Sequence, residues 1–185
     1  CENLSSVIIP ESIKKIGDGA FRGCKNLKSI TIPDGVEEIG KDIFDECAID
    51  NLESKVLKIK NGCALSADGL TVLYGTNINL KEVTIPEGVQ TIRDYAFESL
   101  KNLTSIMIPE SVKYIGRSAF SYCANLTTVT MLEGVEKIED EAFRYCKNLT
   151  TIIIPESIKD IGNYSFENCG IDNFDQENKH HTLTL

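Results

Sequence analysis

The chain has 185 residues, a net charge of −9 and 42% hydrophobic residues. This hydrophobic content is enough for one continuous core. The acidic balance argues against binding to nucleic acid or to an anionic membrane surface, and no apolar run approaches the ~18 residues that a membrane-inserted helix needs.

A 23-residue repeat organises most of the chain. The segment 102–123 reads NLTSIMIPESVKYIGRSAFSYC and returns as NLTTVTMLEGVEKIEDEAFRYC at 125–146. Copies begin at Asn3, Asn26, Asn79, Asn102, Asn125 and Asn148. Self-similarity at a fixed period of this length predicts a solenoid in which each copy is one coil.

Within one copy, Ile106 and Ile108 alternate with polar or outward-facing residues, which predicts a short strand with one buried face. Pro109 ends this strand, and residues 112–115 form a second short extended segment. The return path to Cys123 has room for no more than one helical turn. A glycine follows the second segment in four copies, where a positive φ would be easy to adopt: Gly17, Gly40, Gly116 and Gly162. Arg93 and Glu139 hold the same position in the other two copies, so a left-handed residue is not obligatory there.

Phenylalanine occupies one position of the return path in every copy. Six of the seven phenylalanines lie there: Phe21, Phe44, Phe97, Phe120, Phe143 and Phe166. One coil cannot bury its apolar side chains alone, but stacked coils can bury each column against itself. This column is therefore expected to be the centre of the core.

The pattern NLxxIxIPxxVxxIGxxAFxxC resembles the leucine-rich repeat of the BspA-like (type-5) surface protein family. The resemblance covers about 140 of the 185 residues. It implies a right-handed, β-rich α/β solenoid of 23-residue coils in a secreted or cell-surface protein. The chain lacks the asparagine that follows the strand in the commoner horseshoe pattern, which argues for a flatter coil.

The period is interrupted once, which divides a single predicted solenoid domain into four parts. Two repeats occupy 1–46, an irregular island 47–76, four repeats 77–168, and a partial repeat or cap 169–185. Both ends look like cuts through a longer array, and open coil ends favour end-to-end stacking of copies.

The island is expected to contain a strand beginning near Lys55 and a hairpin from Cys63 to Tyr74 that turns at Asp68-Gly69. BspA-like proteins often carry a similar insert. Its structural role would be to cap one block and dock the next, and the alternative is a protrusion that contacts a ligand.

The cysteines are interpreted as free thiols. Six occupy one repeat position, Cys1, Cys24, Cys47, Cys123, Cys146 and Cys169, and Leu100 fills the same position in one copy. A position that accepts leucine is apolar, and coil spacing is wider than the Cβ separation of a disulfide. A ladder disulfide is the less favoured alternative, and no C-x-x-C pair supports zinc. Cys63 lies outside this column and is predicted to be the most reactive thiol.

An acidic residue occupies the turn after each strand. The positions are Glu11, Asp34, Glu87, Glu110, Glu133 and Glu156. Stacked carboxylates are able to hold Ca²⁺ or to face a basic partner, but they lack the carbonyl-rich loops of calcium sites. Solvated turn residues are the favoured interpretation.

No catalytic or cofactor motif is present. The two histidines, His180 and His181, lie in the tail, and neither a nucleophile elbow nor a phosphate-binding loop nor HExxH occurs. We therefore predict no enzymatic activity, no cofactor and no metal.

The remaining candidate for function is the outward face of the main strands, predicted to form one broad sheet. This candidate partner-binding face comprises Ser6, Ile8, Ser29, Thr31, Glu82, Thr84, Ser105, Met107, Thr128, Thr130, Thr151 and Ile153. It is nearly uncharged, and solenoids bind proteins through such faces. Strand propensity alone explains the same residues. The predicted function is adhesion to an extracellular or cell-surface protein, and the alternative is a spacer array that displays another domain.

Overall fold

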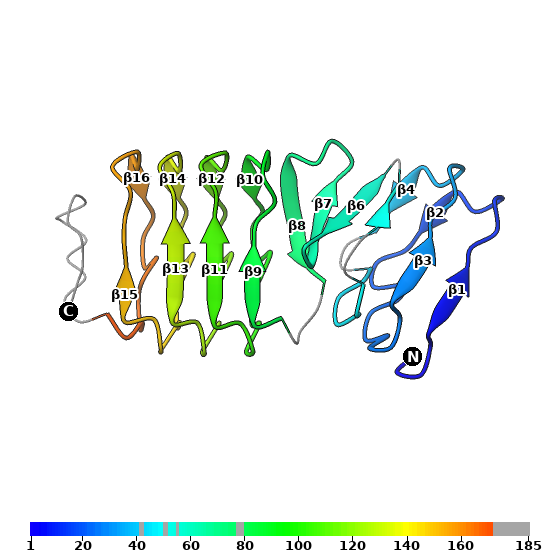
Figure 1. Cartoon of the computed structure of the whole chain (residues 1–185), viewed down its shortest axis with the longest axis horizontal. Coiled ribbons are helices and arrows are strands. Elements are labelled where there is room, and N and C mark those ends of the chain that lie inside the picture. The colour runs from blue at the N-terminus through cyan, green and yellow to red at the C-terminus, as the bar shows by residue number, and fades with distance from the viewer. Residues whose placement is uncertain (41–42, 50–51, 55, 77–79, 172–185) are drawn as a thin grey trace. The chain divides into compact units, whose positions relative to one another are not determined.

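In the computed structural model, residues 1–40, 43–49, 52–54, 56–76 and 80–171 are described. The chain forms two compact units, Cys1–Ile78 and Asn79–Leu185. Each unit is a stack of coils (Figure 1). The prediction of a single domain stays a prediction.

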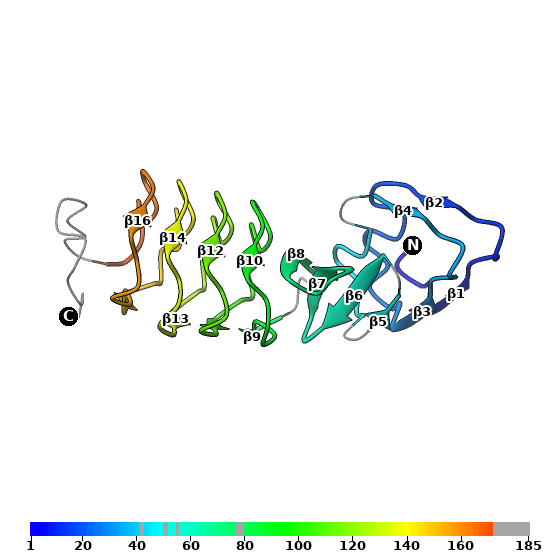
Figure 2. The same ribbon diagram turned by 90° about the horizontal axis from the view of Figure 1, so that it is seen from above.

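The C-terminal unit is the more regular of the two. Each coil carries a main strand and a two-residue second strand on different sides of the coil (Figure 2). The main strands are β9 (Glu82–Thr84), β11 (Ser105–Ile108), β13 (Thr128–Met131) and β15 (Thr151–Ile152). The second strands are β10 (Thr91–Ile92), β12 (Tyr114–Ile115), β14 (Lys137–Ile138) and β16 (Asp160–Ile161). Within each set the strands pair in parallel, and each residue lies opposite the equivalent residue of the next coil.

The phenylalanine column forms the centre of this unit, as predicted. The ring centroids of Phe97 and Phe120 lie 5.1 Å apart, those of Phe120 and Phe143 5.0 Å, and those of Phe143 and Phe166 5.4 Å. Interplanar angles of 4–9° show that the rings are parallel. All four side chains are buried, so each ring shields its neighbours from water.

The N-terminal unit combines two coils with the island. The coils contain β1 (Ser6–Ile8), β2 (Lys15–Ile16), β3 (Ser29–Thr31) and β4 (Glu38–Ile39), with β1 parallel to β3 and β2 parallel to β4. The island is an antiparallel meander of β5 (Leu52–Glu53), β6 (Leu57–Lys60), β7 (Cys63–Ser66) and β8 (Thr71–Gly75).

The predicted hairpin is confirmed. Strands β7 and β8 turn at Asp68-Gly69, where the Gly69 N–H donates to the Ser66 carbonyl at 2.8 Å. A second tight turn at Asn61-Gly62, with φ of 52° and 71°, joins β6 to β7. Asn-Gly at positive φ is the usual two-residue hairpin turn, and this signal was overlooked in the sequence.

The island packs onto the coil that precedes it. Leu57, Ile59 and Tyr74 belong to the same buried cluster as Phe44 and Ile49. The buried Thr76 hydroxyl donates to the carbonyls of Ile49 and Gly62, at 2.9 and 3.0 Å. The island therefore covers one end of the first block, as the capping interpretation predicted. Its proposed docking of the next block stays a prediction.

The return paths are turns rather than helices. Strands and turns account for all regular structure in the described residues, so the α component predicted for the fold finds no counterpart there, and handedness stays a prediction. In one turn, the N–H groups of Tyr95, Phe97 and Ser99 donate to carbonyls of the following coil at 2.7–2.9 Å. Tyr95 and Ser99 have positive φ. These hydrogen bonds between coils satisfy backbone N–H and C=O groups of the return path, which forms the third side of each coil after the two strands.

The glycines after the second strands have a different reason from the one predicted. Gly40, Gly116 and Gly162 do not lie at positive φ, so the ease of adopting one does not explain these glycines. A Cβ on Gly116 would lie 2.5 Å from the Asp94 nitrogen, and the Asp94 carboxylate accepts the Arg117 N–H at 2.8 Å. Asp18 faces Gly40 and Asp140 faces Gly162 in the same way. Arg117 replaces the aspartate in one coil, and there the glycine of the following coil is replaced by Glu139. Glycine is therefore found at this position where an aspartate of the preceding coil lies against it.

The seven cysteines are free, and four of the six in the repeat column donate hydrogen bonds. The thiols of Cys47, Cys123, Cys146 and Cys169 each lie 3.0–3.2 Å from the phenylalanine carbonyl of the preceding coil. This hydrogen bond is a reason for cysteine at a position where leucine also fits, because leucine has no donor group.

The prediction that Cys63 is the most reactive thiol is wrong. Cys63 is fully buried, and desolvation raises its pKa to about 12. Because the thiolate is the nucleophile, a raised pKa suppresses its reaction at neutral pH. The residue contributes to the island core as a small apolar side chain.

Candidate binding face

The twelve predicted residues all lie on main strands or directly after them, and they point outward. Eleven are exposed and Ser105 is half-buried. They do not share one sheet, because β1 and β3 form a two-stranded sheet, whereas β9, β11, β13 and β15 form a four-stranded sheet. The expectation of one broad sheet is therefore corrected. We call the eight residues of the four-stranded sheet the sheet face: Glu82, Thr84, Ser105, Met107, Thr128, Thr130, Thr151 and Ile153.

The parallel register arranges the sheet face in two rows. Glu82, Ser105, Thr128 and Thr151 are partners across the strands. Thr84, Met107 and Thr130 form the second row. Ile153, directly after β15, follows Thr130 by one repeat. Met107 is 45% exposed and Ile153 58%. The rows place two solvent-exposed aliphatic side chains around one threonine.

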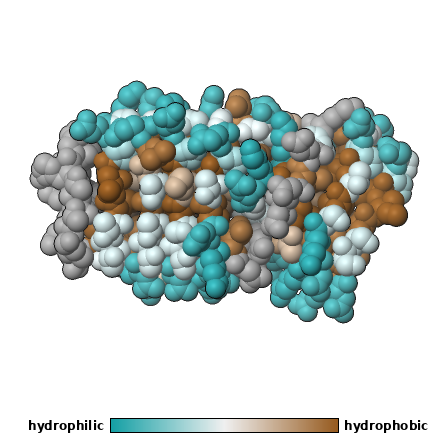
Figure 3. Space-filling view, in the orientation of Figure 1, coloured by the Kyte–Doolittle hydropathy of each residue, from teal (hydrophilic) through white to brown (hydrophobic). Residues whose placement is uncertain are grey.

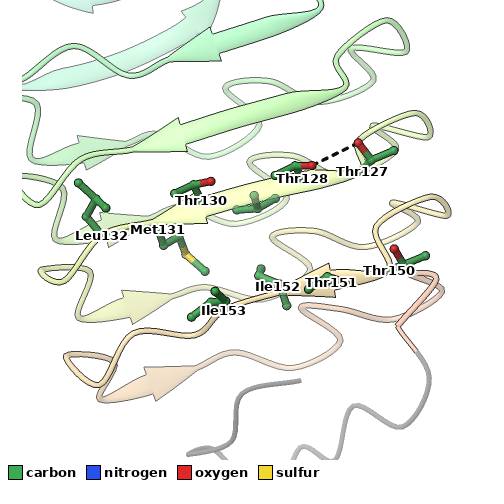
Figure 4. A pocket seen from close by; sticks show the side chains of 10 residues that line it. Thr127, Thr128, Thr130, Met131, Leu132, Thr150, Thr151, Ile152 and Ile153 are labelled. Carbon is green, nitrogen blue, oxygen red and sulfur yellow. Dashed lines mark hydrogen bonds between the residues drawn. The ribbon is translucent and has the colours of Figure 1, made fainter. Parts of the chain in front are cut away.

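A hollow of about 570 Å³ lies at the β13–β15 end of the sheet face (Figure 4). Residues 127–132 and 150–153 line it, and four of them belong to the sheet face. Met131 and Ile153 lie beside each other along its floor, and the hydroxyls of Thr127 and Thr128 lie 3.4 Å apart. No lining residue carries a charge. The hollow joins threonine hydroxyls to aliphatic surface, a mixture that suits uncharged ligand groups.

Charged side chains gather on other sides of the coil. Among the sheet-face residues, Glu82 alone is charged. On the second strands and the segments leading into them, Lys159 pairs with Glu136 at 2.5 Å, and Lys137 with Asp160 at 3.6 Å. In Figure 3, white and brown atoms fill the middle of the visible face of the C-terminal unit, and teal atoms lie above and below. Apart from Glu82, the sheet face is thus an uncharged area bordered by charged side chains.

Side-chain ladders hold the start of each main strand. The hydroxyls of Thr104 and Thr127 donate to the carbonyls of Lys81 and Thr104, one coil earlier, at 2.9 and 3.0 Å. The Asn148 amide donates to the Asn125 side chain at 3.2 Å. These bonds give the recurring Asn-Leu-Thr a structural role and fix the coils in register.

The acidic turn residues are exposed, as expected for solvated positions. One of them has a structural task, because the Glu133 carboxylate accepts the N–H groups of Glu156 and Ser157 at 3.2 and 3.1 Å. Such a carboxylate caps the turn of the following coil. Across the described ranges, no group of three or more His, Cys, Asp or Glu side chains is placed to hold a metal ion.

Two features of the candidate sites escaped the sequence interpretation. The hollow depends on how β15 departs from β13, which the repeat pattern does not contain. Four tyrosines also recur in two turn positions: Tyr95 and Tyr164 in one, Tyr122 and Tyr145 in the other. Their recurrence was a signal available in the sequence. His180 and His181 lie outside the described residues, as does most of the predicted partial repeat or cap of residues 169–185.

The stacked coils are those of a leucine-rich repeat solenoid. A family model described as BspA type Leucine rich repeat region matches residues 1–74 and 69–184 with six copies. The chain belongs to this family. Among curated proteins, none matches the chain.

Solved structures of bacterial proteins share the fold. A leucine-rich cell surface protein from Faecalibacterium prausnitzii is 28% identical with a TM-score of 0.60, and the match covers 87% of this chain and 50% of that one. The leucine-rich repeat protein of T. pallidum is 27% identical with a TM-score of 0.54, covering 85% and 73%. The pneumococcal vaccine antigen PcpA shares the fold with a TM-score of 0.62 at 20% identity, covering 86% and 47%.

The chain thus spans about half the length of the F. prausnitzii protein and of PcpA. Its relatives are leucine-rich repeat proteins, among them bacterial surface proteins. Solenoids of this class are generally binding scaffolds rather than enzymes. In the part of the chain that the structure describes, no helix is long and apolar enough to cross a membrane.

Proposed function

We propose that this chain is a non-enzymatic protein-binding module of a secreted or cell-surface protein, and that it adheres to an extracellular or cell-surface protein through the sheet face. The observation that carries the proposal is a strip of exposed hydroxyl and aliphatic side chains with one charged residue, Glu82, on a protein of net charge −9. Depletion of charge distinguishes the centre of protein interfaces from other surface. The hollow beside β15 adds a concave place for an anchoring side chain.

Lysine substitutions across the second row test this proposal. The triple variant Met107→Lys, Thr130→Lys and Ile153→Lys places three charges in the middle of the face. Burying unpaired charges against a partner is costly, so we expect affinity for any captured protein to fall at least about a hundredfold. Binding is measured by surface plasmon resonance against purified extracellular-matrix and cell-surface proteins.

A charge-matched control separates the face from net charge. Replacing Glu87, Glu110 and Glu156 with glutamine also raises the charge by three, at exposed turn positions. This variant should retain binding, and circular dichroism should show both variants folded. Equal binding by the parent and the triple-lysine variant would refute the sheet-face assignment. Capture of nothing in the panel would favour the alternative of a spacer array.

A further inference from the structure

Four tyrosines of the C-terminal unit lie at positive φ in the turns of the third side. The φ angles are 62° at Tyr95, 61° at Tyr122, 61° at Tyr145 and 58° at Tyr164. Three of these side chains are 47–55% exposed and Tyr145 is half-buried. We call this set, with the outward residues of turns 94–99, 117–122, 140–145 and 163–168, the tyrosine face.

The fold requires the positive φ but not the tyrosine. The same two turn positions are held by Gly19 and Gly23 in the first coil, and by Ser118 and Ser99 in others. A bulky residue in the left-handed region is strained relative to glycine. Strained residues that the fold does not need are a reason to look for function.

The faces of these tyrosine rings contact one another and a guanidinium group. Tyr122 and Tyr145 stack at 4.8 Å with an interplanar angle of 16°. The Arg144 guanidinium lies 4.9 Å from the Tyr145 ring centroid and 5.8 Å from that of Tyr164. It also pairs with Glu141 at 3.2 Å and with Glu167 at 2.5 Å. The face therefore already holds one guanidinium by ring faces and carboxylates together.

The charge of this face indicates the sign of a partner. Its four turns carry five carboxylates against two arginines, a balance of −3. Tyrosine with neighbouring carboxylates is the surface that attracts lysine and arginine side chains, by cation–π and ionic contact. Tyrosine also provides a large contact area with few rotatable bonds.

We propose that the tyrosine face is a second binding surface, and that it takes an arginine- or lysine-bearing segment of a protein partner. The incoming cations stack on the exposed ring faces of Tyr95, Tyr122 and Tyr164 and pair with neighbouring carboxylates, in the manner of Arg144. This surface is independent of the sheet face, which lies on another side of the coil and carries a single charged residue, Glu82.

A peptide-binding measurement tests this proposal with the whole chain. The probe is a fluorescent peptide of alternating glycine and arginine, and the matched probe has citrulline, a neutral isostere, in place of arginine. We expect the arginine peptide to bind in physiological salt and the citrulline peptide not to bind. The variant Tyr122→Ser with Tyr164→Ser changes no charge and uses residues found at the same turn positions. It should weaken binding about tenfold or more, while Tyr122→Phe with Tyr164→Phe retains it.

The alternative to exclude is unspecific attraction by the net charge. Equal affinity of the parent and the serine variant for the arginine peptide would overturn the proposal, as would the absence of binding in physiological salt. Circular dichroism verifies that the serine variant is folded. The outcome does not depend on the sheet-face experiment, because the two sets of variants share no residue.

Discussion

Replacement of Phe120 by alanine is expected to destabilise the C-terminal unit by about 3–5 kcal/mol, the cost of removing a fully buried aromatic ring. Phe120 has no solvent exposure, and its ring lies between those of Phe97 and Phe143, at 5.1 and 5.0 Å. Backbone ladders on all sides of the coil hold the coils apart, so the cavity left by the ring cannot close. The measurement is the free energy of unfolding from urea denaturation followed by circular dichroism.

A surface substitution in the same coil provides the control. Lys113 is exposed and follows the buried Val112. Lys113→Ala should change the free energy of unfolding by no more than about 0.5 kcal/mol. A loss below about 1 kcal/mol for Phe120→Ala would contradict the central place given to the phenylalanine column.

The second large effect is expected from Gly116→Ala. The new Cβ would lie 2.5 Å from the Asp94 nitrogen and 2.7 Å from the Arg93 carbonyl carbon, which are backbone atoms that cannot rotate away. Forcing the two coils apart should lower the free energy of unfolding by about 1–3 kcal/mol. Urea denaturation measures this loss as well.

Gly17 is the matched control, because it occupies the same repeat position. A Cβ on Gly17 has no atom within 4 Å, and its φ is not positive. Gly17→Ala should therefore be neutral or stabilise by up to about 1 kcal/mol, since alanine restricts the unfolded chain. Similar losses in both variants would show that backbone conformation, rather than the close approach of coils, requires glycine.

The repeat allowed much of the coil to be predicted. Residues that must stack on their equivalents one period away, such as the phenylalanine column and the paired strands β11 and β13, follow from the period alone. The outward placement of Met107 and Thr130 follows from the alternation of a strand.

Features that arise between neighbouring coils were less accessible. Gly116 is required because Asp94 of the preceding coil lies against it. Asp94 is 22 residues earlier, so the sequence of one repeat copy does not predict this contact. Cys63 falls outside the repeat column, but the packing of the meander buries it completely. The hollow between β13 and β15 depends on where each strand ends, which the repeat period does not specify.

The tyrosines show a different limit. A repeat comparison finds no consensus at the position of Tyr122 and Tyr145, where the other copies carry glycine, glutamate, serine or asparagine, and so assigns the tyrosines no role. Their positive φ and their stacking become visible only when the turns are built. Bulky residues at positive φ, at turn positions that also accept glycine or serine, are therefore useful places to search for binding surfaces in solenoids.

The most direct test of the central proposal is site-specific photocrosslinking from the sheet face. A photoreactive phenylalanine analogue is placed at Thr130, between Met107 and Ile153, and separately at Lys113 as a control. Each protein is irradiated with a partner captured from the purified panel, and crosslinks are mapped by mass spectrometry. We expect crosslinks from Thr130 and none from Lys113. Crosslinks from Lys113 alone would contradict binding through the sheet face.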